Sequence, residues 1–335
     1  MIQEARLYEK LGDKKVNCKL CAHNCKISDG KRGICGVRQN NDGVLNTLIY
    51  GSITSQTPDP IEKKPLFHFH PGSSAYSLGT IGCNFSCDHC LNSSISFAKV
   101  GEVHTNEVPP KTVIEAARRL KCQGIAWTYN EPTIWYEYTY DGSVLAKEAG
   151  LYSVYVTNGY MSEFALEEIS PYLDAANVDV KAFRGEFYKK ICGATLEPVL
   201  RTCEMIKKMN IHLELTYLII PTQNDDPTEI RDFCDWVSSI GIETPVHFSA
   251  FHPTNGKSAN LNPTSIEMLE TAHKIAKKAG IEYVYLGNVY AHRYESTYCP
   301  DCDELLIERR GFHIIPRTNS YEKCPKCGKK LNIIS

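Results

Sequence analysis

The distribution of cysteine constrains this chain more than any other feature. The chain contains 15 cysteines, and most of them fall into three groups with the short spacings that metal ligands need. The groups are Cys18, Cys21, Cys25 and Cys35; then Cys83, Cys87 and Cys90; then Cys299, Cys302, Cys324 and Cys327. The charged N-terminus lacks the apolar segment of a secretory signal, so we expect a cytoplasmic protein with reduced thiols. Such thiols bind metal more often than they form disulfides.

Charge and hydropathy argue against a protein that works on membranes or nucleic acids. The chain carries 37 Lys and Arg against 39 Asp and Glu, a formal net charge of −2, so it lacks the broad basic surface of nucleic-acid-binding proteins. No stretch approaches the roughly 18 apolar residues of a membrane span. With 42% hydrophobic residues among 335, the chain can form a large core. We expect a globular protein with neither a membrane nor a nucleic acid as partner.

Between the second and third cysteine groups, short β-rich runs alternate with amphipathic helical segments. Seven runs read as strands: 75–78, 125–129, 153–156, 177–180, 212–220, 246–251 and 282–286. This alternation predicts an α/β fold with a parallel sheet, either a partial (β/α) barrel of the TIM type or a doubly wound sheet. We expect a Cys-rich metal knuckle and a lid-like segment in residues 1–72, the barrel in 73–290 and a zinc-ribbon-like knuckle in 291–335.

Polar residues follow the ends of several predicted strands. They are Asn130 and Glu131 after the second strand, Thr157 and Asn158 after the third, Asp179 and Lys181 at the fourth, and His252 after the sixth. Barrel enzymes carry their chemistry at the carboxyl ends of the strands, so this placement favours the partial barrel. Taken singly, the segments 130–132 and 157–159 also fit plain turns, and Asp179 with Lys181 fits a buried ion pair.

The middle cysteine group follows the first predicted strand in the spacing C-x3-C-x2-C. A [4Fe–4S] cluster normally takes four cysteines, so three leave one iron open to a substrate or cofactor. The alternative is a zinc site completed by His89 or Asp88. That alternative is disfavoured because His89 would be strained as a ligand directly beside Cys90.

The motifs around this group resemble the radical S-adenosylmethionine (SAM) superfamily, whose cluster motif has an aromatic residue where His89 stands. Further runs resemble the AmmeMemoRadiSam-system radical SAM enzymes, relatives of pyruvate formate-lyase activating enzyme. These are Gly-Cys-Asn-Phe at 82–85, Thr-Tyr-Asn-Glu-Pro-Thr at 128–133, Val-Thr-Asn-Gly-Tyr at 156–160 and Asp-Pro-Ile-Glu-Lys-Lys-Pro at 59–65. The resemblance covers nearly the whole chain, including the terminal cysteine pairs.

The resemblance implies a mechanism and its cofactors. The open iron of a [4Fe–4S] cluster on Cys83, Cys87 and Cys90 would bind SAM, and one electron would cleave SAM to methionine and a 5′-deoxyadenosyl radical that abstracts hydrogen. A low-potential donor such as ferredoxin or flavodoxin would supply the electron. The resemblance also implies Memo-family proteins of the same system as partners. It leaves the substrate unspecified.

The same resemblance implies roles for the strand-end residues. Asn130 and Glu131 match the strand end that binds the methionine amine, where a carboxylate suits an ammonium group. The positions that hold the SAM carboxylate and ribose are matched by Thr157, Asn158, Asp179 and Lys181, and a histidine after the sixth strand is matched by His252. The chain departs from the activating enzymes at Val156, where they carry Asp, and at Thr216, where they carry Arg.

The two outer cysteine groups predict further metal sites. Cys299, Cys302, Cys324 and Cys327 form two C-x2-C pairs typical of a tetrahedral zinc ribbon, with rubredoxin-like iron as the alternative. Cys18, Cys21, Cys25 and Cys35 are less regularly spaced and fit zinc or a second iron–sulfur cluster. A structural metal is favoured there, since nothing in the segment implies an electron-transfer partner.

Two other functions stay open. A glycyl-radical enzyme activating enzyme would use the same chemistry on a large protein substrate, and a zinc/Fe–S module that binds RNA would belong to another class. The run 59–65, followed by His68 and His70, precedes the first barrel strand and fits a charged surface turn. The equal alternative is a lid over the barrel mouth. In this hypothesis Glu62, Lys63 and His68 reach the substrate.

Overall fold

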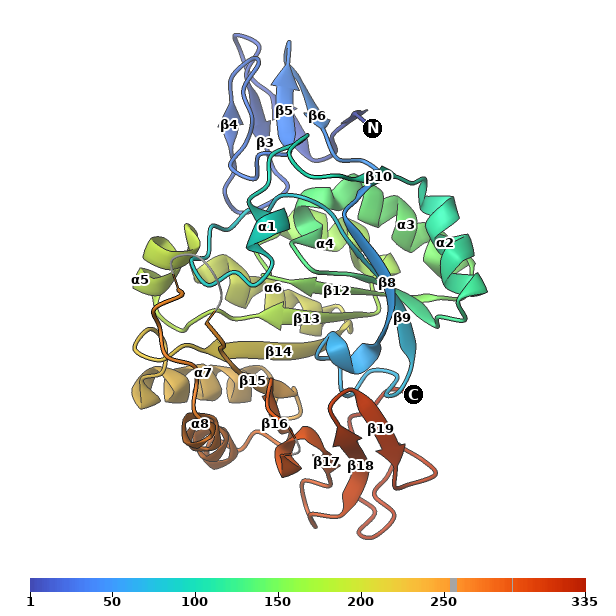
Figure 1. The fold of residues 1–335 in the computed structure, drawn as a ribbon, viewed down its shortest axis with the longest axis vertical. Helices are drawn as coiled ribbons and strands as arrows, with labels where there is room; N and C mark the ends of the chain where they lie inside the picture. The colour runs from blue at the N-terminus through green and yellow to red at the C-terminus, as the bar shows by residue number, and fades with distance from the viewer. Residues whose placement is uncertain (254–257, 291) are drawn as a thin grey trace.

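The molecule is built on one eight-stranded sheet, shown in Figure 1 as a computed structural model that describes residues 1–253, 258–290 and 292–335. Seven strands run parallel and lie beside one another in chain order, while an eighth is antiparallel at one edge. From that edge they are β8 (Ser55–Pro60), β9 (Ser74–Gly79), β11 (Gly124–Trp127), β12 (Tyr152–Thr157), β13 (Ala175–Asp179), β14 (His212–Ile219), β15 (Val246–Ala250) and β16 (Val284–Gly287). A doubly wound sheet would reverse its strand order, so the predicted partial (β/α) barrel is confirmed.

Helices return the chain between successive parallel strands. They are α2 (Pro110–Arg119), α3 (Tyr136–Glu148), α4 (Glu163–Ile169), α6 (Glu197–Lys208), α7 (Pro227–Ile240) and α8 (Ile266–Lys278). Ser162, Asp226 and Ser265 cap α4, α7 and α8 because each side chain accepts a hydrogen bond from a backbone N–H of the first turn. Within the described ranges, no helix is both long enough and apolar enough to cross a membrane.

Shorter elements complete the barrel region. They are α1 (Ser93–Ser96), α5 (Gly185–Phe187), the 3₁₀ turns η1 (Ile61–Lys63), η2 (Pro132–Trp135), η3 (Ser170–Tyr172) and η5 (Arg293–Glu295), and the π-helical turn η4 (Tyr188–Cys192). The outward face of the sheet packs against the helices. Trp127 is buried there, and its indole Nε1 donates to the hydroxyls of Ser143 in α3 and Ser153 in β12, each at 3.0 Å. These bonds satisfy the one polar atom of a large buried ring.

The inward face of the sheet is closed at the amino ends of the strands by the segment after β8. Ile61, Leu66 and Phe69 pack there against small side chains of the sheet, among them Ala75 and Ala126. Because β8 runs antiparallel to β9, Pro60 lies opposite Ser74, at the start of that strand. The segment is therefore a plug at the end of the barrel opposite the cysteine loop.

The structure does not support the lid hypothesis for Glu62 and His68, while Lys63 is partly exposed and its Nζ bonds to Asp59 Oδ1 at 2.8 Å. Glu62 is buried beside Arg309 and accepts a hydrogen bond from Gly72 N, while His68 is buried between Asn332 O and the Tyr285 hydroxyl. Hydrophobic residues on both sides of the charged run are drawn into the barrel floor, and they carry the charges with them. The sequence pattern of charges between prolines does not reveal at which end of the barrel the segment lies.

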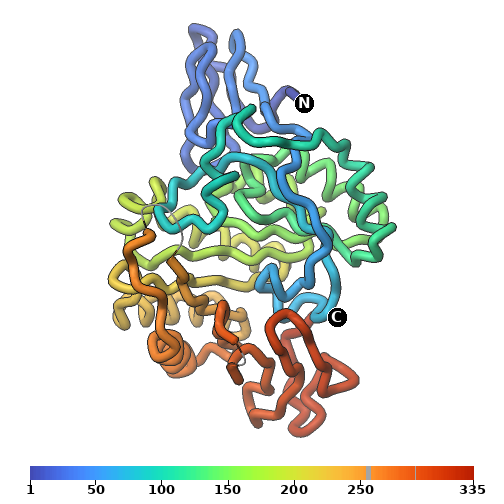
Figure 2. The backbone as a smooth tube through the Cα atoms, in the orientation of Figure 1, coloured from blue at the N-terminus to red at the C-terminus, as the bar shows by residue number. Residues whose placement is uncertain are grey.

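The N-terminal knuckle stands on the carboxyl-end side of the barrel, in blue in Figure 2. Its small sheets combine β1 (Gln3–Glu4), β5 (Arg38–Asn41) and β6 (Val44–Thr47) in one, β2 (Tyr8–Lys10), β3 (Val16–Cys18) and β4 (Lys26–Ile27) in another, and β7 (Ser52–Ile53) with β10 (Asn106–Glu107) in a third. The knuckle contacts the loop after β12. There Ala22 N donates to Tyr160 O at 3.1 Å, and Cys21 forms an isolated antiparallel β-bridge with Met161.

The C-terminal knuckle lies at the opposite pole of the molecule, in red in Figure 2. It contains β17 (Thr297–Tyr298), β18 (Leu305–Arg310) and β19 (His313–Pro316). Arg309 of this knuckle is buried, and its guanidinium donates to Phe67 O at 2.8 Å and to Thr297 Oγ1 at 2.6 Å. The knuckle and the plug together therefore seal the floor of the barrel.

Candidate active site

The three-cysteine loop starts directly after β9, at the carboxyl end of the sheet. Cys83 Sγ accepts a hydrogen bond from Phe85 N at 3.4 Å and lies 3.8 Å from Asn158 Nδ2. Cys90 Sγ lies 3.6 Å from Ser96 Oγ. Donors such as Phe85 N and the Asn158 amide stabilise a thiolate, the form in which cysteine binds metal.

The spacing of the loop sulfurs tests the zinc alternative. Sulfurs around a tetrahedral zinc lie about 3.8 Å apart, because each Zn–S bond is about 2.3 Å. Among the residues that the structure describes, only the C-terminal cysteines bring three ligand atoms of His, Cys, Asp or Glu within 4.8 Å of one another. The loop around Cys83 therefore does not gather a zinc site with His89 or Asp88, and its wider spacing fits the corners of a cluster.

A glycine places this loop against the N-terminal knuckle. Gly82 has φ of +90°, and a Cβ there would lie 2.7 Å from Val37 Cγ1 and 3.0 Å from Cys35 O. Only glycine combines this backbone conformation with so close an approach. The residue before Cys83 is therefore in contact with a ligand-bearing segment of the knuckle.

Asn130 holds the cysteine loop to the end of β11. Its Oδ1 accepts from Thr80 N at 3.1 Å, and its Nδ2 donates to Gly82 O at 2.8 Å. The preceding Tyr129 has φ of +72°, an uncommon conformation for a residue with a side chain, and its carbonyl accepts from Asn92 Nδ2. Backbone strain of this kind collects at functional sites, and here it turns Asn130 toward the loop.

Glu131 is only 1% exposed and connects two strand ends. Its Oε1 accepts from Thr133 N at 2.9 Å and from Thr157 Oγ1 at 2.7 Å, and its Oε2 accepts from Asn158 N at 2.8 Å. Burial raises the pKa of the carboxyl group, although these donors work against the shift. With three protein donors, Glu131 acts here as a bracket between the ends of β11 and β12, and its predicted contact with SAM stays a prediction.

Thr157 and Asn158 lie beside the cysteine loop. The Thr157 hydroxyl donates to Glu131, and Asn158 Nδ2 donates to Asn84 Oδ1 at 2.8 Å as well as facing Cys83 Sγ. Asn158 is thus the predicted cofactor residue with the most direct contact to a candidate cluster ligand. Its position follows from the parallel pairing of β11 with β12, which brings the two strand ends to one edge.

The remaining predicted residues have other hydrogen-bond and packing partners. Asp179, which ends β13, and Lys181, two residues later, are half-buried and form an ion pair at 2.7 Å, which agrees with the ion-pair alternative. His89 is buried with its ring centroid 5.9 Å from that of Phe187, and burial lowers its pKa to about 3. His252 is exposed after β15, where Nε2 lies 3.2 Å from Asn288 O. The structure thus brings Asn130, Glu131, Thr157 and Asn158 together with the cysteines, but not His252.

Cys192 lies outside the three cysteine groups, and its place beside the barrel loop was not predicted from the sequence. This buried thiol ends the π-helical turn η4, and a hydrogen bond between it and Cys87 is the largest cause of a lowered pKa at Cys87. Ser86 N donates to Cys192 O at 2.9 Å, which fixes the loop beside the turn. A single cysteine far along the chain carries no spacing signal, so only the folded structure reveals this neighbour.

The N-terminal cysteines line a small cavity of about 20 Å³. Buried Arg38 also lines it, and its Nη1 lies 3.6 Å from Cys18 Sγ. Burial raises the pKa of the Cys21 thiol to about 12, so binding of a metal would have to displace its proton. His23 also lines this cavity, and its Nε2 bonds to Asn84 O at 2.7 Å.

The C-terminal cysteines form a compact group that can hold a metal ion. Cys299 Sγ lies 3.5 Å from Cys327 Sγ, and Cys302 Sγ lies 3.6 Å from Cys324 Sγ. These separations are close to the roughly 3.8 Å expected around tetrahedral zinc. The cysteine spacing predicted this group correctly.

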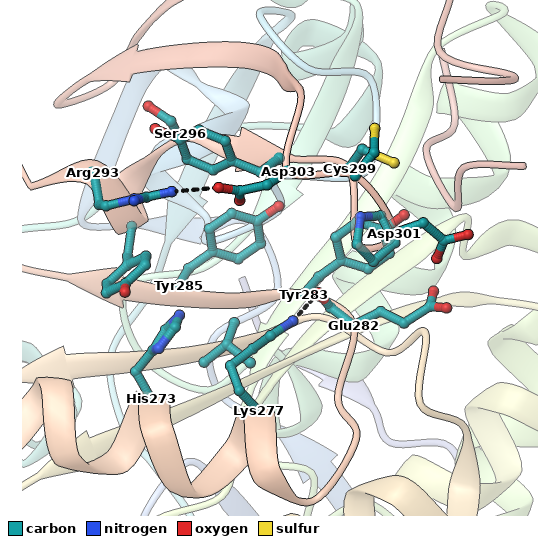
Figure 3. Close-up of a pocket in the computed structure, with 15 residues that line it drawn as sticks. His273, Lys277, Glu282, Tyr283, Tyr285, Arg293, Ser296, Cys299, Asp301 and Asp303 are labelled. Carbon is teal, nitrogen blue, oxygen red and sulfur yellow. Dashed lines mark hydrogen bonds and ion pairs between the residues drawn. The ribbon is translucent and has the colours of Figure 1, made fainter. Parts of the chain in front are cut away.

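A groove of about 500 Å³ lies between this knuckle and the barrel. Figure 3 shows Lys277 and Glu282 on one wall and Arg293, paired with Asp303 at 3.0 Å, on the other. None of the predicted SAM-binding residues lines it. Charged side chains in the groove bond to the protein itself: Lys277 Nζ, for example, donates to Ile281 O and Glu282 O. The groove is therefore the seam where the knuckle docks on the barrel.

Comparison with known proteins agrees with this geometry. Residues 78–234 match the Radical SAM superfamily. The chain is 46% identical over 336 residues to uncharacterized protein MJ0808 of Methanocaldococcus jannaschii, covering 99% of this chain and 100% of that one. It is 26% identical over 221 residues to the putative glycyl-radical enzyme activating enzyme MJ1632 of the same organism, covering 65% of this chain and 80% of that one.

Among solved structures, a radical SAM methyltransferase from Sphaerobacter thermophilus superposes with a TM-score of 0.52 at 17% identity, over 65% of this chain and 67% of that one. At this identity the likeness shows the fold alone. The sequence match covers the cysteine loop and the strand ends from β9 to α7, the same region in which the candidate ligands converge. The chain is a radical SAM enzyme and belongs to the Radical SAM superfamily.

Proposed function

We propose that this protein reductively cleaves SAM at a [4Fe–4S] cluster held by Cys83, Cys87 and Cys90 and uses the resulting radical on a substrate. The observation that carries the proposal is the three-cysteine loop at the carboxyl end of β9, whose described ligand atoms do not gather three within 4.8 Å of one another as those of the C-terminal cysteines do. When bound, the cluster and SAM would supply a one-electron cleavage that yields methionine and a 5′-deoxyadenosyl radical, which abstracts hydrogen.

The chain's own residues would hold and shape this site. Asn158 would stabilise the thiolate of Cys83, whose sulfur lies 3.8 Å from the Asn158 amide nitrogen. Asn130 would anchor the loop through its hydrogen bond to Gly82 O. Glu131 would position Thr157 and Asn158 beside the cofactor, with its remaining lone pair available to the methionine amine. Asp179 and Lys181 would serve the SAM carboxylate and ribose, while His89 and His252 would complete the cofactor-binding set.

Further cofactors and partners belong to the same proposal. Zn²⁺ would occupy the C-terminal cysteines, whose sulfurs have the spacing of a tetrahedral site. A low-potential donor such as ferredoxin or flavodoxin would provide electrons. Membership of the AmmeMemoRadiSam system, with Memo-family partners, rests on the sequence motifs, and the substrate is left open.

The proposal is tested by removing the ligand set of the loop. Simultaneous replacement of Cys83, Cys87 and Cys90 by alanine should remove about four irons per chain and all reductive SAM cleavage, because no ligand shell remains. Cys122→Ala, which removes a buried thiol outside the three groups, should leave both unchanged. Iron analysis and detection of 5′-deoxyadenosine after anaerobic reconstitution measure the two effects. SAM cleavage that survives in the triple variant would refute the proposal.

A glycyl-radical enzyme activating enzyme is the second candidate. The similarity to MJ1632, named as a putative activating enzyme, favours it over the RNA-binding module considered from the sequence. The two substrate classes can be separated by giving the reduced protein and SAM either the protein fraction or the small-molecule fraction of a cell extract. A 5′-deoxyadenosine-dependent radical on a protein supports the activating enzyme, whereas a mass change confined to the small-molecule fraction excludes it.

A further inference from the structure

The N-terminal cysteines enclose a space where a zinc site would have none. We propose that Cys18, Cys21, Cys25 and Cys35 hold a second iron–sulfur cluster, which passes electrons to the cysteine loop of the barrel. The identity of this metal site does not depend on the proposed function. Only its role as an electron donor to the barrel cluster rests on that function.

Size is the first argument. Around zinc, four sulfurs at about 2.3 Å from the ion leave no room for a water-sized sphere between them. These four cysteines instead line a small cavity of about 20 Å³, and no three of their sulfurs lie within 4.8 Å of one another. On the corners of a cubane cluster, ligand sulfurs lie roughly 6 Å apart. The C-terminal cysteines, with separations of 3.5 and 3.6 Å, show how the same chain arranges ligands for a single ion.

Charge is the second argument. Arg38 is 1% exposed; its Nη1 donates to Arg6 O at 3.1 Å and lies 3.6 Å from Cys18 Sγ, while its Nη2 pairs with buried Glu137. Its Nε has no hydrogen-bond partner among the described residues and lies in the same buried region. A buried cation beside the sulfurs stabilises the additional negative charge that a cluster gains on reduction. Zinc has no such reduced state, so a cluster makes fuller use of this arginine.

Contact with the barrel loop is the third argument. His23, between the ligands Cys21 and Cys25, bonds through Nε2 to Asn84 O at 2.7 Å, and Asn84 adjoins Cys83. Cys35 O lies 3.0 Å from the place where a Cβ of Gly82 would stand, on the other side of Cys83. Two ligand-bearing segments of the knuckle therefore touch both chain neighbours of one candidate cluster ligand. These contacts place the N-terminal cysteines directly beside the barrel loop.

The electron balance is simple. A low-potential one-electron donor of the flavodoxin type would reduce the second cluster and would itself be oxidised by one electron. That electron would pass to the barrel site by way of the His23–Asn84 contact, returning the second cluster to its oxidised state. No bond in the knuckle forms or breaks.

The first experiment counts iron in the full chain after anaerobic reconstitution. The wild-type protein should bind about eight irons, the triple alanine variant of Cys83, Cys87 and Cys90 about four, and Cys21→Ala/Cys25→Ala about four. The triple variant should still give the electron paramagnetic resonance signal of a reduced cluster, whether or not the barrel site cleaves SAM. Zinc instead of iron in the triple variant, or no metal in it, would overturn the proposal and leave the proposed function intact.

The second experiment tests the electron path. Reduced wild-type protein should show a spectrum broadened by coupling between two clusters, and Cys21→Ala/Cys25→Ala should lose this broadening. His23→Ala should keep about eight irons. The His23→Ala variant should cleave SAM normally with dithionite but lose most of the cleavage driven by reduced flavodoxin. The control His104→Ala, at an exposed position, should lose no flavodoxin-driven cleavage. Equal flavodoxin-driven rates in both histidine variants would refute the relay, even with two clusters present.

Discussion

Arg309 offers the sharpest test of how the C-terminal knuckle is bound to the barrel. Its side chain is 0% exposed, and its guanidinium lies 4.1 Å from the Phe67 ring centroid and 3.9 Å from Glu62 Oε1, a carboxylate that is also 0% exposed. Replacement by methionine keeps the apolar stem but leaves Glu62 buried without its cation. Breaking a buried pair in this way costs about 3–5 kcal/mol.

This cost should appear as release of the knuckle. At about 1.4 kcal/mol for each factor of ten, native-state proteolysis should detect roughly a hundredfold to several thousandfold more opening in Arg309→Met. The effect should also depend on pH. Burial raises the pKa of Glu62 and Arg309 lowers it, so loss of the arginine raises that pKa further above its unfolded value. The variant should therefore be least stable relative to wild type at high pH, where the carboxylate must stay charged.

Arg310→Met is the matched control. This neighbouring arginine is 71% exposed and pairs with Glu308 at the surface, so its loss should cost no more than about 1 kcal/mol. Adding Glu62→Gln to Arg309→Met should recover part of the lost stability, because it removes the unpaired charge. Equal opening of the two arginine variants would show that the buried pair does not hold the knuckle.

Three further predictions concern the loop, the floor and the C-terminal metal. Gly82→Ala should lose the iron of the barrel site because its Cβ meets Val37 and Cys35 O, whereas Gly101→Ala, with φ of +93° and open space, should keep it; equal iron contents would contradict this. Burial lowers the pKa of His68 to about 3, so stability should fall as the pH drops below 6.5, by about 2 kcal/mol at pH 5. Unfolding of His68→Asn should lack this slope, and an unchanged slope would locate the acid sensitivity elsewhere. Cys302→Ser should release zinc and expose the knuckle to protease while the iron content persists; loss of iron would mean that the metals are coupled.

The sequence by itself determined the elements and the ligands that lie close together along the chain. Strand and helix periods follow from which residues must be buried on one face, so all seven parallel strands could be located before the fold was known. Cysteine groups can also be recognised in the sequence, because their spacing is local. Ligands within a few residues of one another are brought together by local chain geometry, as in the compact C-terminal group.

Only the tertiary structure decided how these pieces meet. The bond from Arg309 to Phe67 O spans 242 residues and the contact of His23 with Asn84 spans 61, and neither leaves a spacing pattern in the sequence. The position of Glu131 after a predicted strand placed it correctly at the carboxyl-end edge of the sheet. It did not predict the three protein donors that bond to its carboxylate. Residue type and order specify local conformation, whereas the separation of sulfurs, the partner of a buried charge and the end of the barrel that a segment closes are set by packing between distant parts of the chain.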